Sequence, residues 1–208
     1  MIQPRFTDKQ IYYPVMEHFY TLQGEGRYAG YAAYFIRLAG CDVGCSWCDV
    51  KESWEVSEDQ YMDVHVLTDS VKKSGAELVV LTGGEPAMYN LGPLTDSLQE
   101  IGVTINIETS GAYPLSGSLD WICVSPKRFK LPLDESLAKA DELKVIVVNK
   151  QDLKWAGELA AKCKNECVLL LQPEWDRAAR NYAKIIDFIK INPQWKLSLQ
   201  VHKFLNIP

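Results

Sequence analysis

The sequence lacks the features that mark secreted, membrane-spanning or polyanion-binding proteins. No run of 18 apolar residues occurs, so no membrane-spanning helix is expected. Residues 1–8 contain no apolar stretch like that of a secretory signal, so we expect a cytoplasmic protein. A formal net charge of −5 argues against a general nucleic-acid-binding surface. Six cysteines in 208 residues are too few for a disulfide-stapled scaffold, and we find neither repeats nor low-complexity segments.

The composition is that of an ordinary globular domain. Hydrophobic residues make up 47% of the chain and charged residues 24%, and 208 residues can enclose one full core. Residues 1–14 are predicted to form a loose N-terminal arm that ends at Pro14. We therefore expect a single domain over residues 1–208 that begins with this short arm.

Short apolar runs alternate with helical segments along the chain. Strands are predicted at residues 15–22, 33–38, 78–81, 103–108, 121–124, 143–148, 168–171 and 197–201. Helices are predicted from a capping box at Ser57 and Gln60 to Lys73, and then at 92–101, 153–164 and 176–191. Such alternation indicates an α/β fold with a parallel sheet. About six β/α units fit the length, so we expect an open, partial (β/α)6-type barrel, with a doubly wound sheet as the alternative.

The most informative segment is a loop with three closely spaced cysteines. Cys41, Cys45 and Cys48 have the spacing CxxxCxxC. Three thiolates on one loop can hold three irons of a 4Fe–4S cluster, which leaves the fourth iron open to a substrate or cofactor. A zinc site or free thiols are the alternatives. Zinc sites usually combine two cysteine or histidine pairs, however, and the chain has neither a second CxxC nor an HxxxH pair.

Polar clusters follow four of the predicted strands. They are Thr82-Gly83-Gly84-Glu85-Pro86, Glu108-Thr109-Ser110-Gly111, Ser125-Pro126-Lys127 and Gln172-Pro173. In parallel β/α folds, ligands bind at the carboxyl ends of the strands, and paired glycines let the backbone approach a ligand closely. Any one cluster could be an ordinary turn. Together, downstream of the cysteine loop, they indicate one shared cofactor site.

The cysteine loop, with the aromatic Trp47 before its last cysteine, resembles that of the radical S-adenosylmethionine (radical SAM) superfamily. Nearly the whole chain is similar to one family within it, the 7-carboxy-7-deazaguanine synthases. The segments that carry this resemblance are 19–26, 35–41, 45–49, 82–86, 108–111, 124–127 and 197–208. The Gly-Gly-Glu-Pro stretch is common to the superfamily, whereas segments 22–26 and 200–203 are more particular to the family.

The resemblance implies an enzyme that contracts the ring of 6-carboxy-5,6,7,8-tetrahydropterin to 7-carboxy-7-deazaguanine and releases ammonia, in queuosine or other 7-deazapurine biosynthesis. It also implies a 4Fe–4S cluster on the three cysteines, S-adenosylmethionine as cofactor, flavodoxin or ferredoxin as electron donor, and a homodimer. The implied cofactor-binding residues are Trp47, Gly83, Gly84, Glu85, Glu108, Thr109, Ser110, Ser125, Lys127 and Gln172.

The substrate-binding residues that the resemblance implies are Leu22, Gln23, Gly24, Glu25, Arg37, Thr82, His202 and Pro208. Their chemistry suits a pterin. The amide of Gln23 and the carboxylate of Glu25 can pair with a 2-aminopyrimidinone edge, and Arg37 can bind a carboxylate bidentately. In the family the terminal carboxylate can reach the substrate, and this sequence ends at the matching place, Pro208.

One position departs from the family pattern. Relatives often have Thr or Ser after the Cys-Asp pair, with a hydroxyl that binds Mg²⁺ beside the substrate carboxylate, whereas this chain has Val50 after Asp49. An isopropyl group cannot bind a hard cation, which takes oxygen ligands. We expect Asp49, water and substrate to hold the ion; the alternative is that another residue replaces its charge.

Other functions remain open on the residues alone. Another small radical SAM enzyme, such as a glycyl-radical activase, would share the cysteine loop but leave Gln23 and Glu25 without a task. An iron–sulfur electron carrier or a zinc module would not need glycines at a strand exit. Elsewhere, Cys123 is predicted to be buried, Cys163 and Cys167 to be free thiols, and residues 139–144 to form a solvated face.

Overall fold

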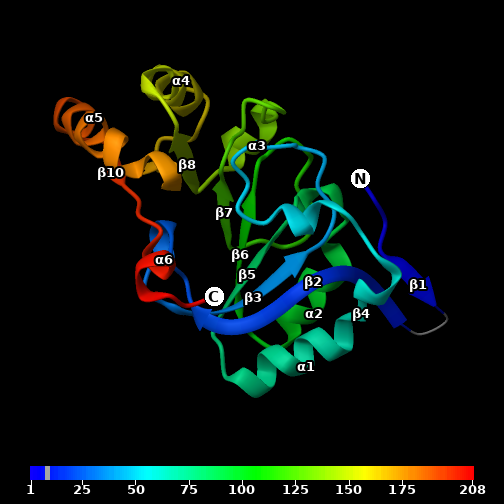
Figure 1. The fold of residues 1–208 in the computed structure, drawn as a ribbon. Helices are drawn as coiled ribbons and strands as arrows, with labels where there is room; N and C mark the ends of the chain where they lie inside the picture. Colours follow the sequence, from blue (N-terminus) through cyan, green and yellow to red (C-terminus); the bar gives the residue numbers. More distant parts are fainter. Residues whose placement is uncertain (8–9) are drawn as a thin grey trace.

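The computed structural model describes residues 1–7 and 10–208. In these residues a ten-stranded curved sheet has the order β1-β2-β3-β5-β6-β7-β8-β9-β10, with β4 paired to β2 (Figure 1). The strands are β1 (Arg5–Thr7), β2 (Gln10–Leu22), β3 (Ala32–Leu38), β4 (Tyr61–Asp63), β5 (Leu78–Gly83), β6 (Thr104–Thr109), β7 (Trp121–Val124), β8 (Glu142–Val147), β9 (Val168–Pro173) and β10 (Trp195–Leu197).

Helices connect most of these strands. The α-helices are α1 (Val64–Ser74), α2 (Gly92–Glu100), α3 (Asp134–Lys139), α4 (Lys150–Ala160), α5 (Ala178–Ile191) and α6 (Val201–Leu205). Five 3₁₀ turns are η1 (Gly26–Tyr28), η2 (Lys51–Trp54), η3 (Glu58–Gln60), η4 (Pro86–Met88) and η5 (Trp175–Arg177). In the described part of the chain, every helix is too short or too polar to cross a lipid bilayer.

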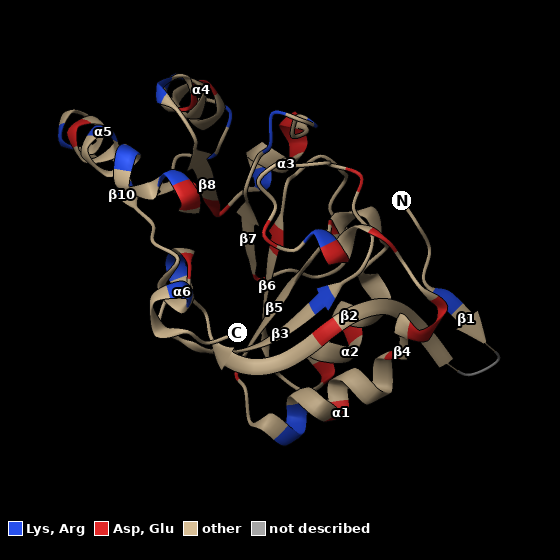
Figure 2. Ribbon diagram, in the orientation of Figure 1, with Lys and Arg blue, Asp and Glu red and all other residues tan. Residues whose placement is uncertain are grey.

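Along the sheet, β3, β5, β6, β7, β8, β9 and β10 pair in parallel, whereas β2 pairs with β3 and with β4 in the antiparallel direction. Because β1 and β10 stand at opposite ends of the strand order, the sheet is an open one. The predicted α/β class with a mostly parallel sheet is confirmed. Basic and acidic residues are mixed on the outer helices α4 and α5 (Figure 2), which suits helices that face water on one side.

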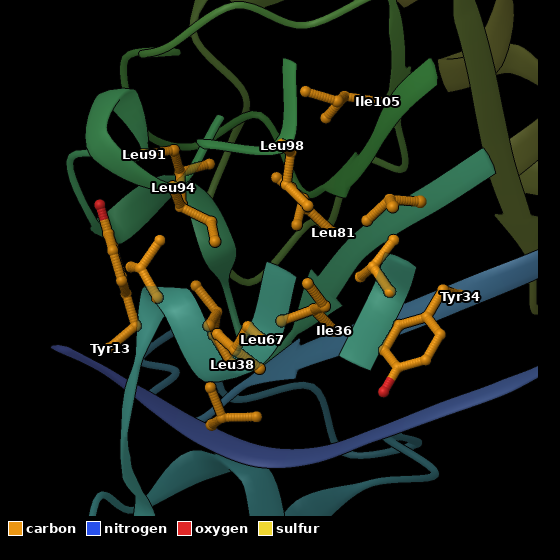
Figure 3. Close-up of a cluster of buried hydrophobic side chains, with 14 of the residues drawn as sticks. Tyr13, Tyr34, Ile36, Leu38, Leu67, Leu81, Leu91, Leu94, Leu98 and Ile105 are labelled. Atoms are coloured by element: carbon orange, nitrogen blue, oxygen red, sulfur yellow. The ribbon is translucent and has the colours of Figure 1, made fainter. Parts of the chain in front are cut away.

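Successive residues of a strand point to opposite faces of the sheet, and this alternation separates core from site. On the helix side, Ile36 and Leu38 of β3 and Leu81 of β5 pack with Leu67 of α1 and Leu94 of α2 in one apolar cluster (Figure 3). A second cluster lies where β8 and β9 meet α4 and α5. The opposite face carries polar and charged residues, which are described below.

The N-terminal prediction was wrong in part. Residues 10–14 belong to strand β2 rather than to a loose arm, and they pair with β4 on one side and β1 on the other. Tyr13 is fully buried, and its hydroxyl donates to the carbonyl of Asn90 at 2.6 Å. The partner strand β4 lies some fifty residues away along the chain, so the pairing could not be read from residues 1–14 themselves.

Two other elements differ from the prediction. The capping box at Ser57 and Gln60 exists, but it opens only η3, and α1 begins later, at Val64, with Asp63 accepting from the His65 N–H at 2.7 Å. The helix ends near the predicted Lys73, because Gly75 adopts the left-handed region and caps it. The predicted strand at 197–201 was largely wrong, since β10 ends at Leu197 and residues 201–205 form α6.

Candidate active site

A cavity of about 550 Å³ opens at the carboxyl ends of the parallel strands. It is bounded by the cysteine loop after β3, by the exits of β5, β6, β8 and β9, and by the C-terminal segment around α6. All the residues predicted for the cluster, the cofactor, the magnesium ion and the substrate line it. The structure thus brings together segments that are spread over most of the chain, because parallel strands present their carboxyl ends at one edge.

The three cysteines face this cavity from one loop. Cys45 is buried, Cys41 and Cys48 are half-buried, and all three are free thiols. Burial raises the pKa of Cys41, and it raises the pKa of Cys45 to about 11 although the charge of Lys127 opposes it. Thiolates at such a site need a positive partner, such as a metal cluster, to offset their desolvation.

The chemistry of these three thiols suits an iron–sulfur cluster. In residues 1–7 and 10–208, no three His, Cys, Asp or Glu side chains converge closely enough to hold one metal ion. A zinc site gathers all its ligands around one ion, whereas each cysteine of a 4Fe–4S site binds a different iron. Cys41, Cys45 and Cys48 all line the cavity as free thiols, the ligand type that a 4Fe–4S cluster takes.

Gly83 and Gly84 seat the end of β5 against the cysteine loop. A Cβ atom on Gly83 would collide with the carbonyl oxygen of Leu38, and one on Gly84 with that of Gly40. Because neither residue has a side chain, the two backbone segments come close enough to bond. The Gly84 N–H donates to the Leu38 carbonyl and the Glu85 N–H to the Gly40 carbonyl, both at 2.9 Å. The paired glycines thus permit close backbone packing within the protein as well as exposure to the cavity.

Glu85, predicted to bind the cofactor, is 1% exposed, and its carboxylate is occupied by the protein. It accepts from the Ala87 N–H at 3.0 Å, from the Ser110 N–H at 2.8 Å, and from the hydroxyls of Thr109 and Ser110. These bonds join the exit of β5 to the exit of β6. Glu85 therefore fixes the shape of the cavity wall at Thr109 and Ser110.

The floor of the cavity is a buried charge network around Lys144, a residue that the sequence analysis missed. Lys144 is 2% exposed, and its Nζ donates to Glu25 Oε2 at 2.5 Å and to Glu108 Oε2 at 2.8 Å. Gln200 donates to the other oxygen of Glu25 at 2.9 Å, and Gln23 to the other oxygen of Glu108 at 2.8 Å. Four segments distant in sequence thus meet at one ammonium group.

These interactions favour the charged forms of Glu25 and Lys144. Burial by itself would raise the pKa of Glu25. The charge of the Lys144 ammonium and the hydrogen bonds from Lys144, Gln172 and Gln200 outweigh burial and lower this pKa to about 2. Burial likewise lowers the pKa of Lys144, but Glu108 and Glu25 raise it well above its usual value. With two carboxyl groups around one ammonium, this floor is rich in hydrogen-bond acceptors and favours ligand groups that donate hydrogen bonds.

The predicted solvated face at 139–144 was wrong. Glu142 and Lys144 are both 2% exposed and lie on the cavity side of β8, where parallel strands flank them on both edges. Glu142 accepts from the Arg27 N–H at 3.0 Å and from the Trp121 indole at 3.1 Å, which holds η1 against β7. The sequence held a signal for this burial in the alternation Glu-Leu-Lys-Val-Ile-Val of a predicted strand. A parallel strand is buried on both faces, so charged residues within it are buried and must be paired. Cys123 is buried as predicted.

The C-terminal segment lines one side of the cavity. The Val201 N–H donates to the Gly24 carbonyl at 2.9 Å, and His202 packs so closely on Gly24 that a Cβ there would collide with its ring. Burial lowers the pKa of His202. Lys203 lies 3.1 Å from the Asp49 carboxylate, so the segment bridges to the cysteine loop.

Arg37 lies on the cavity side of β3, next to the cysteine loop. Its Nε donates to Glu17 on the neighbouring strand at 2.6 Å. Within the described residues, its terminal nitrogens make no hydrogen bond, so they remain available to an anion in the cavity. Gln23 differs, because its amide already serves Glu108 and the Glu25 N–H.

Comparison with known proteins places the chain in a family. The Radical SAM superfamily matches residues 35–149. The 7-carboxy-7-deazaguanine synthase of Flavobacterium psychrophilum is 49% identical to this chain, over 94% of this chain and 92% of the relative. That of Synechocystis is 46% identical, over 94% of this chain and 93% of the relative. The crystal structure of QueE from Escherichia coli superposes with a TM-score of 0.80 at 36% identity, covering 92% of this chain and 95% of that one. The chain belongs to the 7-carboxy-7-deazaguanine synthase family of radical SAM enzymes.

Proposed function

We propose that this chain converts 6-carboxy-5,6,7,8-tetrahydropterin to 7-carboxy-7-deazaguanine, with loss of ammonia. The observation that carries the proposal is that one cavity joins the three-cysteine loop to a floor of two carboxyl groups held by a buried lysine. A radical SAM site needs the first feature, and a pterin ring rich in N–H donors suits the second. An activase that admits a protein backbone would have no evident use for this floor.

When bound, a reduced 4Fe–4S cluster and S-adenosylmethionine supply a 5′-deoxyadenosyl radical that can take a hydrogen atom from the pterin ring. Cys41, Cys45 and Cys48 would hold the cluster. The strand exits around the cavity would hold S-adenosylmethionine through backbone groups and short polar side chains, at positions 83–84, 109–110 and 125–127. Because Glu85 is fully engaged by the protein, its part would be to position Thr109 and Ser110.

The substrate would lie over Glu25 and Glu108, with its 2-aminopyrimidinone donors directed at their oxygens. Lys144 holds both carboxylates in place, so they need no reorganisation when the substrate binds. Gln23 would position Glu108 rather than recognise the ring directly. Arg37 would bind the substrate carboxylate through its free terminal nitrogens.

Anaerobic reconstitution followed by mass spectrometry tests this function. The protein should bind about four irons, should release 5′-deoxyadenosine from S-adenosylmethionine, and should form 7-carboxy-7-deazaguanine when the pterin is added. Cys45→Ala should lose both cluster and cleavage, whereas Cys163→Ala, away from the cavity, should keep them. Cleavage without the 7-deazaguanine product would point to another radical SAM reaction, and a colourless protein with one zinc would refute the cluster.

Two further proposals come from the family resemblance. We propose flavodoxin or ferredoxin as the reductant, which turnover with each purified carrier would test against dithionite. We also propose a homodimer in solution, which light scattering after size-exclusion chromatography would test. A monomer with full activity would show that the second subunit is unnecessary.

A further inference from the structure

The magnesium site that the family resemblance implies does not fit the residues of this chain. Asp49 and Val50 line the cavity at the corresponding place, but Val50 offers only methyl groups. The nearest cation to the Asp49 carboxylate is the Lys203 ammonium, whose Nζ lies 3.1 Å from Oδ2. A hard dication requires several oxygen ligands. Here the hydroxyl expected at position 50 is missing, and the carboxylate of Asp49 is paired with a positive charge.

The position of Lys203 is well defined by contacts on both sides. Its helix α6 is joined to Gly24 by the Val201 N–H, and its ammonium lies 5.1 Å from the centre of the Trp175 ring. The Lys203 side chain is 22% exposed, whereas that of Asp49 is 57% exposed. Lys203 is therefore directed inward between the C-terminal segment and the cysteine loop, and it lines the cavity.

An ammonium group has three N–H donors, and Asp49 needs only one of them. The floor of the same cavity demonstrates that one ammonium can bridge two carboxylates, since Lys144 binds Glu25 and Glu108 together. A second anion beside Asp49 would complete the same arrangement around Lys203. The terminal nitrogens of Arg37, in the same cavity, could share that anion.

We propose that the Lys203 ammonium takes the place of a metal ion in this chain and binds the carboxylate of the substrate. The inference rests on the proposed function, because it requires a substrate with a carboxylate. Asp49 then orients the ammonium instead of binding a metal. Substrate binding should consequently be insensitive to metal chelation.

Two stable pterins test the proposal without turnover. Binding of 6-carboxypterin and of 6-methylpterin to the cluster-loaded protein with S-adenosylmethionine can be measured by calorimetry, with added Mg²⁺ or with EDTA. The wild type should prefer the carboxylated ligand equally in both buffers. Lys203→Met should reduce that preference roughly ten- to one-hundred-fold, the value of a charged hydrogen bond, and Lys203→Arg should keep part of it. Lys51→Met, an exposed lysine outside the cavity, is the matched control and should change nothing.

A rescue experiment separates the ammonium from the metal. In the double variant Lys203→Met with Val50→Thr, the hydroxyl and the freed Asp49 should restore the preference when Mg²⁺ is added. Loss of the wild-type preference in EDTA, or its survival in Lys203→Met with normal iron content, would overturn the proposal. If the wild type binds neither pterin, the proposed function itself is wrong and this inference falls with it.

Discussion

Replacing Lys144 by methionine tests the charge network at the floor of the cavity. Methionine keeps much of the length and volume of the side chain but removes the cation between Glu25 and Glu108. Both carboxylates are mostly buried, with side chains 16% and 20% exposed, so water replaces the ammonium poorly. We expect Lys144→Met to destabilise the fold and to loosen the floor on which the pterin would lie.

The lowered pKa of Glu25, to which Gln172 and Gln200 also contribute, gives the order of magnitude. Its fall from the usual 4.5 to about 2 corresponds to about 3 kcal/mol, because one pKa unit is worth about 1.4 kcal/mol. Removal of one partner from a buried ion pair typically costs about 3–5 kcal/mol. For a chain of this size, about 3 kcal/mol lowers the melting temperature by roughly 6–12 °C.

Thermal unfolding of the cluster-loaded protein under anaerobic conditions would measure the effect. The matched control is Lys154→Met, whose ammonium is 85% exposed and lies 3.9 Å from Glu158 on α4. Such an exposed pair contributes about 0–1 kcal/mol, so the control should melt within about 4 °C of the wild type. If Lys144→Met also melts within that interval, the ammonium does not hold the two carboxylates in the way described.

Two more predictions concern the same cavity. Because folding lowers the pKa of Glu25 from 4.5 to about 2, the ionised Glu25 stabilises the fold above pH 4.5, and this stability is lost as the pH falls from 4.5 to about 2. Urea unfolding at several pH values should show this loss in the wild type but not in Glu25→Gln. Parallel acid profiles of the two proteins would contradict the prediction. Gly84→Ala should destabilise the fold by about 1–3 kcal/mol and lower the iron content, because the new Cβ meets the backbone of Gly40. The control Gly157→Ala, which has open space in α4, should instead stabilise the fold by about 0.5–1 kcal/mol. Equal effects of the two variants in melting and iron assays would show that the cysteine loop can move to accept the Cβ without cost.

Much of the site could be predicted from sequence because its signals are local. The spacing of Cys41, Cys45 and Cys48 lies within eight residues, and each polar cluster directly follows a recognisable apolar strand. Once the strands are taken as parallel, their exits must meet at one edge, so a shared cavity follows without coordinates. The Gly75 stop of α1 and the burial of Cys123 were predictable for the same local reasons.

The tertiary structure alone decided which partner each polar group received. Strand β4 and helix α6 are too short to have a periodic signal, and they exist because β2 and Gly24 supply hydrogen-bond partners from far away in the chain. The alternation around Lys144 hints at its burial, but the sequence does not say that Glu25 and Glu108 are its partners, nor that Lys203 pairs with Asp49. Local patterns determine where strands and loops form, but charge pairing depends on distances between distant segments, and only the packed sheet sets those distances.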